Sequence, residues 1–463
     1  MLGWTRRTRN DPAIQHGLGA SFRYAGRPCQ RLSAYNRKAM TSLDRRAFLA
    51  SAGALAAAPA VAANDRITVG MIGVGARAHQ LIETMNKISE VEIVAVNDAY
   101  TGRTERAVHR TGGQARIVKD YREILADKGI DVVTVATPDH WHKRQCIEAM
   151  EAGKDVYCEK PLTYRTEEGL EIAEAVERTK RILQVGSQGM ASARQNKARE
   201  WIKAGKLGRV TMIRANYNRN SASGAWIYPI PPDASPQTVD WEMFLGNAPK
   251  REFSLERFFQ WRCYQDYSGG IGTDLFVHLC TTIHHVMDAT MASEVMAMGD
   301  LYRWKESRDV PDTLNALLRY TEGFTVSLGS TFNNGTGGAG FEFLGTEGSL
   351  RIGSRGMTFT PERSSENNDW IVDSWSEALQ EDYYKRVGRP VRPPAVEPEE
   401  FKETVDDTLV HMRNFFESVK TRKGVEEDVW AGHHAAACSQ LINSSVKRGQ
   451  MVRWDFDRRR ELA

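Results

Sequence analysis

A glycine-rich turn between an apolar run and a helix-like segment is the feature that most constrains this chain. The run Ile67–Ile72 leads into Gly73-x-Gly75-x-x-Ala78, and a helical pattern follows. Glycine permits a tight turn at Gly73 and lets a pyrophosphate approach the backbone closely at Gly75. The small Ala78 lets helix and strand pack closely. Because amides at the start of a helix attract anions, the turn predicts a site for the pyrophosphate of a dinucleotide.

The next apolar run ends near an acid. Residues 91–96 are followed by Asp98, which lies 25 residues after Gly73. A carboxylate near this position accepts hydrogen bonds from an adenosine ribose and repels the extra phosphate of NADP. We therefore predict NAD as the cofactor, although Arg103 and Arg106 lie close enough in the sequence to leave NADP open. An ordinary glycine turn is the weaker alternative, because strand, turn, helix, strand and acid occur in order.

From residue 67 to about residue 188, short apolar runs alternate with helical periods, which is typical of a doubly wound parallel sheet. The predicted strands are residues 67–72, 91–96, 117–118, 132–136, 155–158 and 182–185. The predicted helices include residues 103–110, 121–126, 142–151 and 166–179.

Beyond residue 188 the pattern changes. An aromatic, loop-rich insertion at 219–260 precedes a predicted helix near 271–287. Runs typical of antiparallel strands follow at 294–298, 314–320, 324–331, 340–345 and 349–353, and a proline-rich linker at 387–398 leads to helices at 406–421 and 431–447. We predict an α/β fold in three parts: a leader at 1–63, an NAD(P)-binding Rossmann domain at 64–188, and an α+β domain with a large, mostly antiparallel sheet at 189–463.

The leader has the features of an export signal. Arg45 and Arg46 precede a short alanine-rich stretch, and Ala60-Val61-Ala62 matches a cleavage site. The stretch is too short for a stable membrane anchor. We predict twin-arginine export to the periplasm or outside, with that machinery as a partner and the cofactor bound tightly beforehand. Residues 1–39 look like an upstream extension, and a basic tail with a chance Arg-Arg is the alternative.

Composition argues against a nucleic-acid partner. The chain has 62 Lys and Arg against 59 Asp and Glu, and residues 1–63 hold ten of the former and two of the latter, so the rest carries a net charge of −5. Five scattered cysteines follow the leader, which fits buried thiols better than disulfides. The pairs His284-His285 and His433-His434 lack a companion ligand at suitable spacing, so we predict no metal.

Two further motifs carry polar groups suited to chemistry. Glu159-Lys160-Pro161 directly follows a predicted strand, and the carboxyl ends of parallel strands face the ligand crevice. A glycine pair precedes Asp274 and His278, which share one face if this segment is helical. Taken alone, the first motif is better explained by an exposed lysine at the end of a strand. The spacing of Asp274 and His278 is equally compatible with an ordinary surface pair.

Together these motifs resemble the glucose-fructose oxidoreductase and inositol dehydrogenase family (Gfo/Idh/MocA). Thr137-Pro138 and the segment 239–249 extend the resemblance, the latter to its secreted branch. It implies that Lys160 donates a hydrogen bond to the oxygen that changes between hydroxyl and carbonyl, and that His278 is the general base and acid. It further implies that Asp274 contacts the substrate and tunes His278.

The expected contacts follow from the same resemblance. The predicted cofactor contacts are Gly73, Gly75, Ala76, Arg77, Asp98, Thr137, Pro138, His142, Glu159 and Lys160. The predicted substrate contacts are Trp261, Arg262 and Tyr264. His140 or Trp141 is expected on the nicotinamide side. The aromatic run Trp226, Tyr228, Trp241, Trp261, Tyr264 and Tyr267 fits either stacking on a sugar ring or ordinary core packing.

We therefore predict an exported NAD(P)-dependent oxidoreductase acting on a CH–OH group of a small carbohydrate: a sugar, polyol or glycoside. A homo-oligomer is expected, because the sheets of this family commonly pair between subunits. The alternative is an NAD-dependent glycosidase that works by transient oxidation and elimination on the same fold. Sequences of that kind usually lack the lysine at position 160 and vary position 274. A non-catalytic sugar-binding protein is disfavoured because Lys160, Asp274 and His278 are all present.

Overall fold

The computed structural model describes residues 66–306, 308–353, 356–362, 368–390, 397–402 and 405–462. The predicted leader and its twin-arginine motif lie outside this part of the chain, as do residues 391–396 of the predicted linker. No helix in the described ranges combines the length and apolar character needed to span a membrane.

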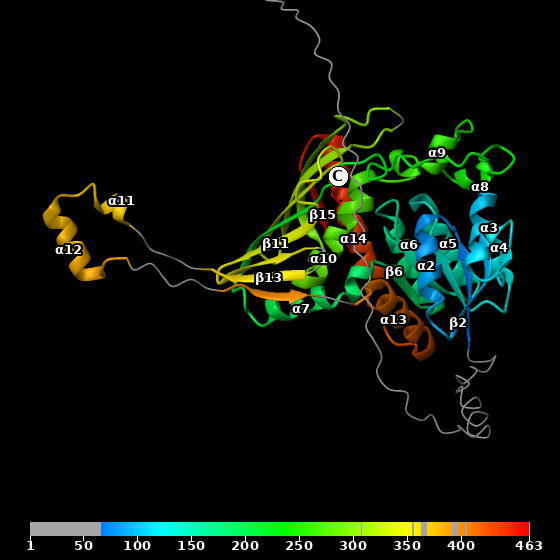
Figure 1. The fold of residues 1–463 in the computed structure, drawn as a ribbon, viewed down its shortest axis with the longest axis horizontal. Helices are drawn as coiled ribbons and strands as arrows, with labels where there is room; N and C mark the ends of the chain where they lie inside the picture. The colour runs from blue at the N-terminus through cyan, green and yellow to red at the C-terminus, as the bar shows by residue number, and fades with distance from the viewer. Residues whose placement is uncertain are drawn as a thin grey trace, which may run out of the picture. The chain divides into compact units, whose positions relative to one another are not determined.

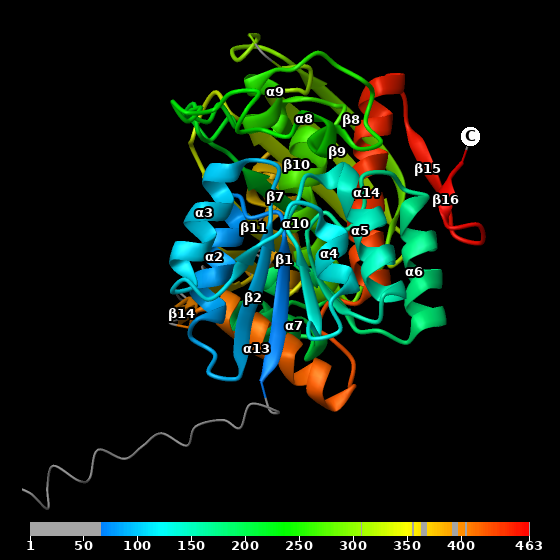
Figure 2. The ribbon, with the colours of Figure 1, turned by 90° about the vertical axis from the view of Figure 1, so that its right-hand side faces the viewer.

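A parallel six-stranded sheet with the order β3-β2-β1-β4-β5-β6 forms the first half of the described chain (Figures 1 and 2). Its strands are β1 (Ile67–Ile72), β2 (Val91–Asn97), β3 (Arg116–Ile117), β4 (Val132–Val135), β5 (Asp155–Glu159) and β6 (Leu183–Gly186). The helices between them are α2 (Ala76–Met85), α3 (Thr101–Arg110), α4 (Tyr121–Ala126), α5 (Asp139–Glu151) and α6 (Glu168–Thr179). The predicted doubly wound sheet is confirmed, and its order reverses between β1 and β4, where such folds bind ligands.

Both faces of this sheet are buried, as the continuous apolar strands require. Helices α4, α5 and α6 cover one face and pack on Ile72 and Val135. Helices α2, α3 and α13 (Asp407–Thr421) cover the other face. Because Phe415 of α13 is fully buried in this second core, the boundary predicted at residue 188 separates the two sheets but not their cores.

A ten-stranded sheet forms the second half, with the order β14-β13-β12-β11-β7-β10-β9-β8-β15-β16 within the described ranges. Its strands are β7 (Val210–Tyr217), β8 (Ala292–Asp300), β9 (Thr313–Tyr320), β10 (Thr325–Thr331), β11 (Ala339–Gly345), β12 (Gly348–Ile352), β13 (Gly356–Pro361), β14 (Glu399–Lys402), β15 (Val452–Asp455) and β16 (Arg460–Glu461). Strands β7 and β10 pair in parallel, and the other neighbours pair antiparallel. The predicted large, mostly antiparallel sheet is confirmed.

The remaining helices lie in the sequence before, between and after these strands. They are η2 (Gln188–Ala191), α7 (Ala193–Lys203), α8 (Trp241–Leu245), α9 (Leu255–Phe259), η3 (Trp261–Cys263), the π-helical turn η4 (Gly272–Phe276), α10 (Val277–Met287), α11 (Asp369–Val372), α12 (Glu377–Val387) and α14 (Val429–Arg448), besides α13. Helix α14 contacts α6 of the first half and β8 of the second, and it lies beside α10 (Figure 1). All five described cysteines are buried free thiols.

Candidate active site

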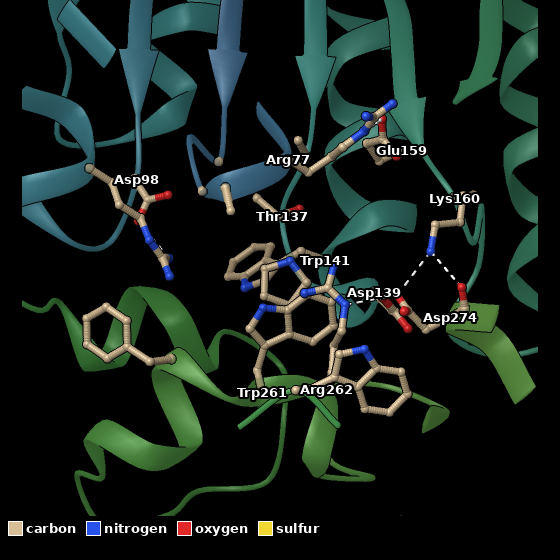
Figure 3. Close-up of a pocket in the computed structure, with 18 of the residues that line it drawn as sticks. Arg77, Asp98, Thr137, Asp139, Trp141, Glu159, Lys160, Trp261, Arg262 and Asp274 are labelled. Carbon is tan, nitrogen blue, oxygen red and sulfur yellow. Dashed lines mark hydrogen bonds and ion pairs between the residues drawn. The ribbon is translucent and has the colours of Figure 1, made fainter. Parts of the chain in front are cut away.

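A cavity of about 580 Å³ lies at the carboxyl ends of the first-half strands, where segments of the second half close over them. Among the residues that line it are the predicted site residues Gly73, Gly75, Ala76, Arg77, Asp98, Thr137, Pro138, Glu159, Lys160, Trp261, Arg262, Asp274 and His278. Figure 3 shows many of them directed into one space from both halves. Groups far apart in the sequence therefore share a cavity of the size that small-molecule sites have.

At one end of the cavity the carboxylate of Asp98 is fixed by backbone amides. Its Oδ2 accepts a hydrogen bond from the Val74 amide at 2.9 Å, and its Oδ1 accepts one from the Tyr100 amide at 3.0 Å. Arg103 lies 3.5 Å from Oδ1, and its guanidinium stacks on the rings of two phenylalanines. Since each carboxylate oxygen can accept a second hydrogen bond, Asp98 is placed to receive ribose hydroxyls.

The glycine turn beside Asp98 fits the pyrophosphate of a dinucleotide. A side chain at Gly73 would come within 2.8 Å of the Ala136 carbonyl group, so this position leaves room only for backbone. The Nε of Arg77 donates to Glu159 at 2.9 Å, but its buried Nη2 has no partner among the described residues. A buried donor without an acceptor is costly, and an anionic ligand would supply the missing acceptor.

We expect Gly73→Ala to destabilise the protein by about 2–4 kcal/mol and to abolish nucleotide retention. Gly73 has φ +81°, which costs other residues about 1–2 kcal/mol, and the close contact adds a further steric cost. Gly113 has the same φ of +81° but open space around it, so Gly113→Ala isolates the cost of the backbone conformation. Thermal unfolding and nucleotide content measure both variants, and equal losses in the two would contradict the steric argument.

At the other end of the cavity, two cations converge on one carboxylate. Lys160 Nζ donates to the backbone oxygen of Asp274 at 2.9 Å and to its Oδ1 at 3.0 Å, as the dashed lines in Figure 3 mark. Arg262 Nε donates to the same Oδ1 at 2.9 Å. Burial raises the pKa of the Asp274 carboxyl, but Lys160 and Arg262 outweigh it and bring this pKa well below its usual range. Asp274 is therefore ionised and holds the ammonium of Lys160 in place.

The predicted helical pair Asp274 and His278 lies at the junction of a π-helical turn and α10. The turn Gly272–Phe276 carries Asp274, and His278 follows in the first turn of α10. Turns of this kind insert one extra residue into a helix and occur often at functional sites. Both side chains line the cavity. Asp274 does so from the π-helical turn and His278 from the regular helix α10, whereas the sequence predicts one regular helix for both.

His278 is a neutral imidazole in this cavity. Burial and then the nearby charge of Lys160 lower its pKa to about 3, against the opposing effect of Asp274. Its ring lies 6.4 Å from the ring of Tyr217, which lines the same cavity. A neutral imidazole has a free ring nitrogen and is able to accept a proton.

Asp139 is a cavity residue that the sequence analysis missed. It begins α5 and lies beside Asp274 in Figure 3, and Thr273 Oγ1 donates to its Oδ2 at 3.4 Å. Burial, and then the charge of Asp274, raises the pKa of Asp139 to about 7. Its place directly after Thr137-Pro138 at the end of β4 was the available signal, but an acid in the first turn of a helix also has an ordinary structural explanation.

The raised pKa of Asp139 predicts a pH dependence of stability. The native state keeps a proton that the unfolded chain loses above its value of 3.8, so stability falls as pH rises from there to about 7. Asparagine cannot ionise, so the Tm of Asp139→Asn should rise relative to wild type between about pH 5 and pH 7. Calorimetry across this range measures the difference. For the same substitution at the exposed Asp457, the difference in Tm between variant and wild type should not change with pH. A difference in Tm that also stays constant for Asp139→Asn would contradict the prediction.

The structure places two of the predicted contact residues outside the lining of the cavity. His142 is only 1% exposed and does not line the cavity. Its ring nitrogens lie 2.7 Å from the Pro161 carbonyl oxygen and 2.9 Å from that of Thr137, so it links two loops instead of touching a cofactor. Tyr264, predicted as a substrate contact, is buried outside the cavity and packs under the guanidinium of Arg257.

The aromatic predictions divide between site and core. Trp226, Tyr228 and Trp261 of the aromatic run line the cavity. The other members, Trp241, Tyr264 and Tyr267, pack in or against the hydrophobic core of the second half. At the start of α5, Trp141 lines the cavity.

Comparison with known proteins agrees with this arrangement. Residues 67–187 match the model of the oxidoreductase family with an NAD-binding Rossmann fold, and residues 236–351 match that of the GFO/IDH/MocA C-terminal domain. Inositol 2-dehydrogenase of Rhodococcus erythropolis (strain PR4) is 32% identical over 161 residues, which are 34% of this chain and 46% of that protein. A glycosyl hydrolase family 109 protein of Shewanella sp. (strain W3-18-1) is 34% identical over 125 residues, 25% of this chain and 27% of that protein.

These matches therefore span less than half the length of both curated relatives. Among solved structures, levoglucosan dehydrogenase in complex with NADH and levoglucosan is 20% identical, with a TM-score of 0.62 over 84% of this chain and 99% of that one. This likeness extends the shared fold across both sheets. The chain belongs to the Gfo/Idh/MocA oxidoreductase family, and its first half is the NAD-binding Rossmann fold of that family.

Proposed function

We propose that this protein is an NAD-dependent oxidoreductase that transfers hydride between a CH–OH carbon of a sugar, polyol or glycoside and the nicotinamide. The observation that carries the proposal is the meeting of Lys160, Asp274 and His278 in the cavity that also holds the Gly73–Ala78 turn. Inositol and levoglucosan dehydrogenases among the similar proteins support the substrate class.

The cofactor would be held along the part of the cavity that residues of the first half of the chain line. The amides of the glycine turn and Arg77 would contact the pyrophosphate, and Asp98 would contact the adenosine ribose. When bound, NAD supplies the acceptor or donor of the hydride. The residues of this chain supply binding, orientation and proton transfer.

Lys160 and His278 perform the polar part of the reaction. Lys160, held by Asp274, donates a hydrogen bond to the oxygen that changes between hydroxyl and carbonyl and stabilises the charge that develops there. His278, being neutral, accepts the hydroxyl proton during oxidation and returns it during reduction. The partly buried rings of Tyr228 and Trp261 offer apolar faces to a sugar ring.

Two properties of the whole protein form part of the proposal. Arg45-Arg46 and the apolar stretch after them support twin-arginine export, with the cofactor tightly bound before transport. Exposed apolar side chains on the ten-stranded sheet, among them Met298 and Leu317, support pairing with a second copy. Sequencing the N-terminus of protein from the periplasmic fraction tests export, and the mass of the native particle tests association.

A specific observation supports a second candidate function. The match to a glycosyl hydrolase family 109 protein makes a glycosidase using bound NAD the competing activity. The lysine at position 160 and the aspartate at position 274 favour the oxidoreductase, because the family resemblance implies that such glycosidases usually lack this lysine and vary this aspartate.

The test uses the purified protein without added cofactor. Denaturation and mass spectrometry of the released nucleotide should identify NAD or NADH. Sugars or polyols incubated with excess NAD should then produce NADH. Release of free sugar from glycosides with no net NADH would instead establish the glycosidase, and absence of any bound or retained dinucleotide would refute both.

A further inference from the structure

The described cations that line the cavity are paired with a carboxylate, with one exception. Within the described ranges, the cations with a carboxylate partner are Arg77 with Glu159 at 2.9 Å, Arg103 with Asp98 at 3.5 Å, Lys160 with Asp274 at 3.0 Å and Arg262 with Asp274 at 2.9 Å. Arg219 also lines the cavity, but it makes no ion pair with any described residue. The pairing leaves one cation available to a ligand.

Arg219 is held in place without using most of its donors. It follows β7, where its amide donates to the Thr331 carbonyl at 2.9 Å, and its Nη1 donates to the Gly224 carbonyl at 3.2 Å. Its guanidinium stacks on the ring of Tyr217 at 5.0 Å from the centroid. Because a guanidinium has five N–H groups, most of the planar fork remains for a partner in the cavity.

The substrate end of the cavity carries an excess of positive charge. Lys160, Arg262 and Arg219 are cations, whereas Asp274 is the firmly ionised acid. Asp139 is partly neutral near pH 7 and His278 is neutral. A partly enclosed cavity with uncompensated charge favours a ligand of the opposite charge.

Resting on the proposed function, we infer that the substrate is an acidic sugar and that Arg219 binds its carboxylate. The planar guanidinium matches a carboxylate with two parallel hydrogen bonds, and the stacking on Tyr217 orients the fork. The same tyrosine ring lies 6.4 Å from the ring of His278. The carboxylate and the oxidised hydroxyl are therefore placed on one sugar unit, as in a hexuronate.

The chain offers a matched control on β7, the strand that precedes Arg219. Arg214 of β7 has a side chain that is 60% exposed and pairs with Glu342 at 3.3 Å on the surface of the sheet. It does not line the cavity. Arg214→Gln therefore removes an equal charge at a similar place in the sequence without changing the proposed contact.

The test is calorimetric binding to the intact protein loaded with NADH. The probes are D-glucuronate, D-galacturonate and D-mannuronate, each against its neutral parent sugar, with D-glucose 6-phosphate as a second anion. At least one uronate should bind about 10- to 100-fold more tightly than its parent, as for other hydrogen bonds to charged groups. Arg219→Gln should abolish the preference and Arg214→Gln should retain it.

A second measurement covers the case in which Arg219→Gln does not fold. The uronate affinity of the wild-type protein should fall as sodium chloride is raised, and that of the neutral sugar should not. The inference is overturned if no uronate binds more tightly than its parent, if the preference survives in Arg219→Gln, or if the sugar phosphate binds more tightly than every uronate. Failure to retain NADH would refute the proposed function instead, so the two failures are distinguishable.

Discussion

Replacing Lys160 with methionine is expected to lower turnover by about 10²- to 10³-fold while the protein keeps its nucleotide. Methionine has a similar length but no ammonium, so the hydrogen bond to the reacting oxygen is lost. The proposed pyrophosphate and ribose contacts lie at the Gly73 turn and at Asp98, away from the substitution. Asp274 keeps Arg262 as a charged partner at 2.9 Å, which protects the fold from an unpaired buried acid. Reduction of NAD by the best sugar and the nucleotide content of denatured protein measure the two effects.

Lys143→Met is the matched control for this substitution. Lys143 of α5 also pairs with a carboxylate, Glu171 at 3.1 Å, but its side chain is 32% exposed and it does not line the cavity. Its removal should change turnover less than twofold, because exposed pairs contribute little. Unchanged turnover in Lys160→Met would remove Lys160 from the mechanism. An equal loss of turnover in Lys160→Met and Lys143→Met would indicate a general effect of removing a positive charge.

Replacing His278 with glutamine should lower kcat by about 10²- to 10⁴-fold, the contribution typical of a positioned general base. In the wild type the pKa of about 3 keeps the imidazole in its basic form throughout the usual range of pH. Acidification from about pH 8 to pH 5 should therefore not reduce kcat/KM through free His278. In the variant the residual rate should rise with pH, because hydroxide replaces the missing base.

His285→Gln tests whether such a loss is specific. His285 is on the same helix, where its Nε2 lies 2.8 Å from Oδ1 of Asn196, and it does not line the cavity. This variant should keep wild-type kcat. A similar fall of kcat in both variants would contradict the assigned role.

The first sheet was predictable because its signal is local. All of its strands except the exposed pair β3 contain short apolar runs between turns, and β1 and α4 have the predicted bounds. Strand β7 was not predicted, because polar or exposed side chains such as Thr211 and Arg214 interrupt its buried positions Val210, Ile213 and Ala215. Its pairing with β10 and β11, which lie far away in the sequence, decides its conformation.

The candidate site was predictable where a motif marks it and not where burial creates it. Lys160 and Asp98 were identified because each follows a strand at the ligand-binding edge. Arg219 has no distinctive neighbours in the sequence, and the place of Asp139 after Thr137-Pro138 also fits an ordinary helix start. The importance of both residues comes from charges that meet only in the folded protein. The surroundings of His142 could not be predicted for the same reason, because only the structure shows its ring enclosed by backbone carbonyl groups.

A crystal structure of the protein with NADH measures most directly whether one cofactor links the two halves of the site. We predict the pyrophosphate against the Gly73–Ala78 turn, the adenosine ribose at Asp98, and the nicotinamide ring between Lys160 and His278. A nicotinamide distant from both side chains, or a nucleotide bound outside this cavity, would contradict the account.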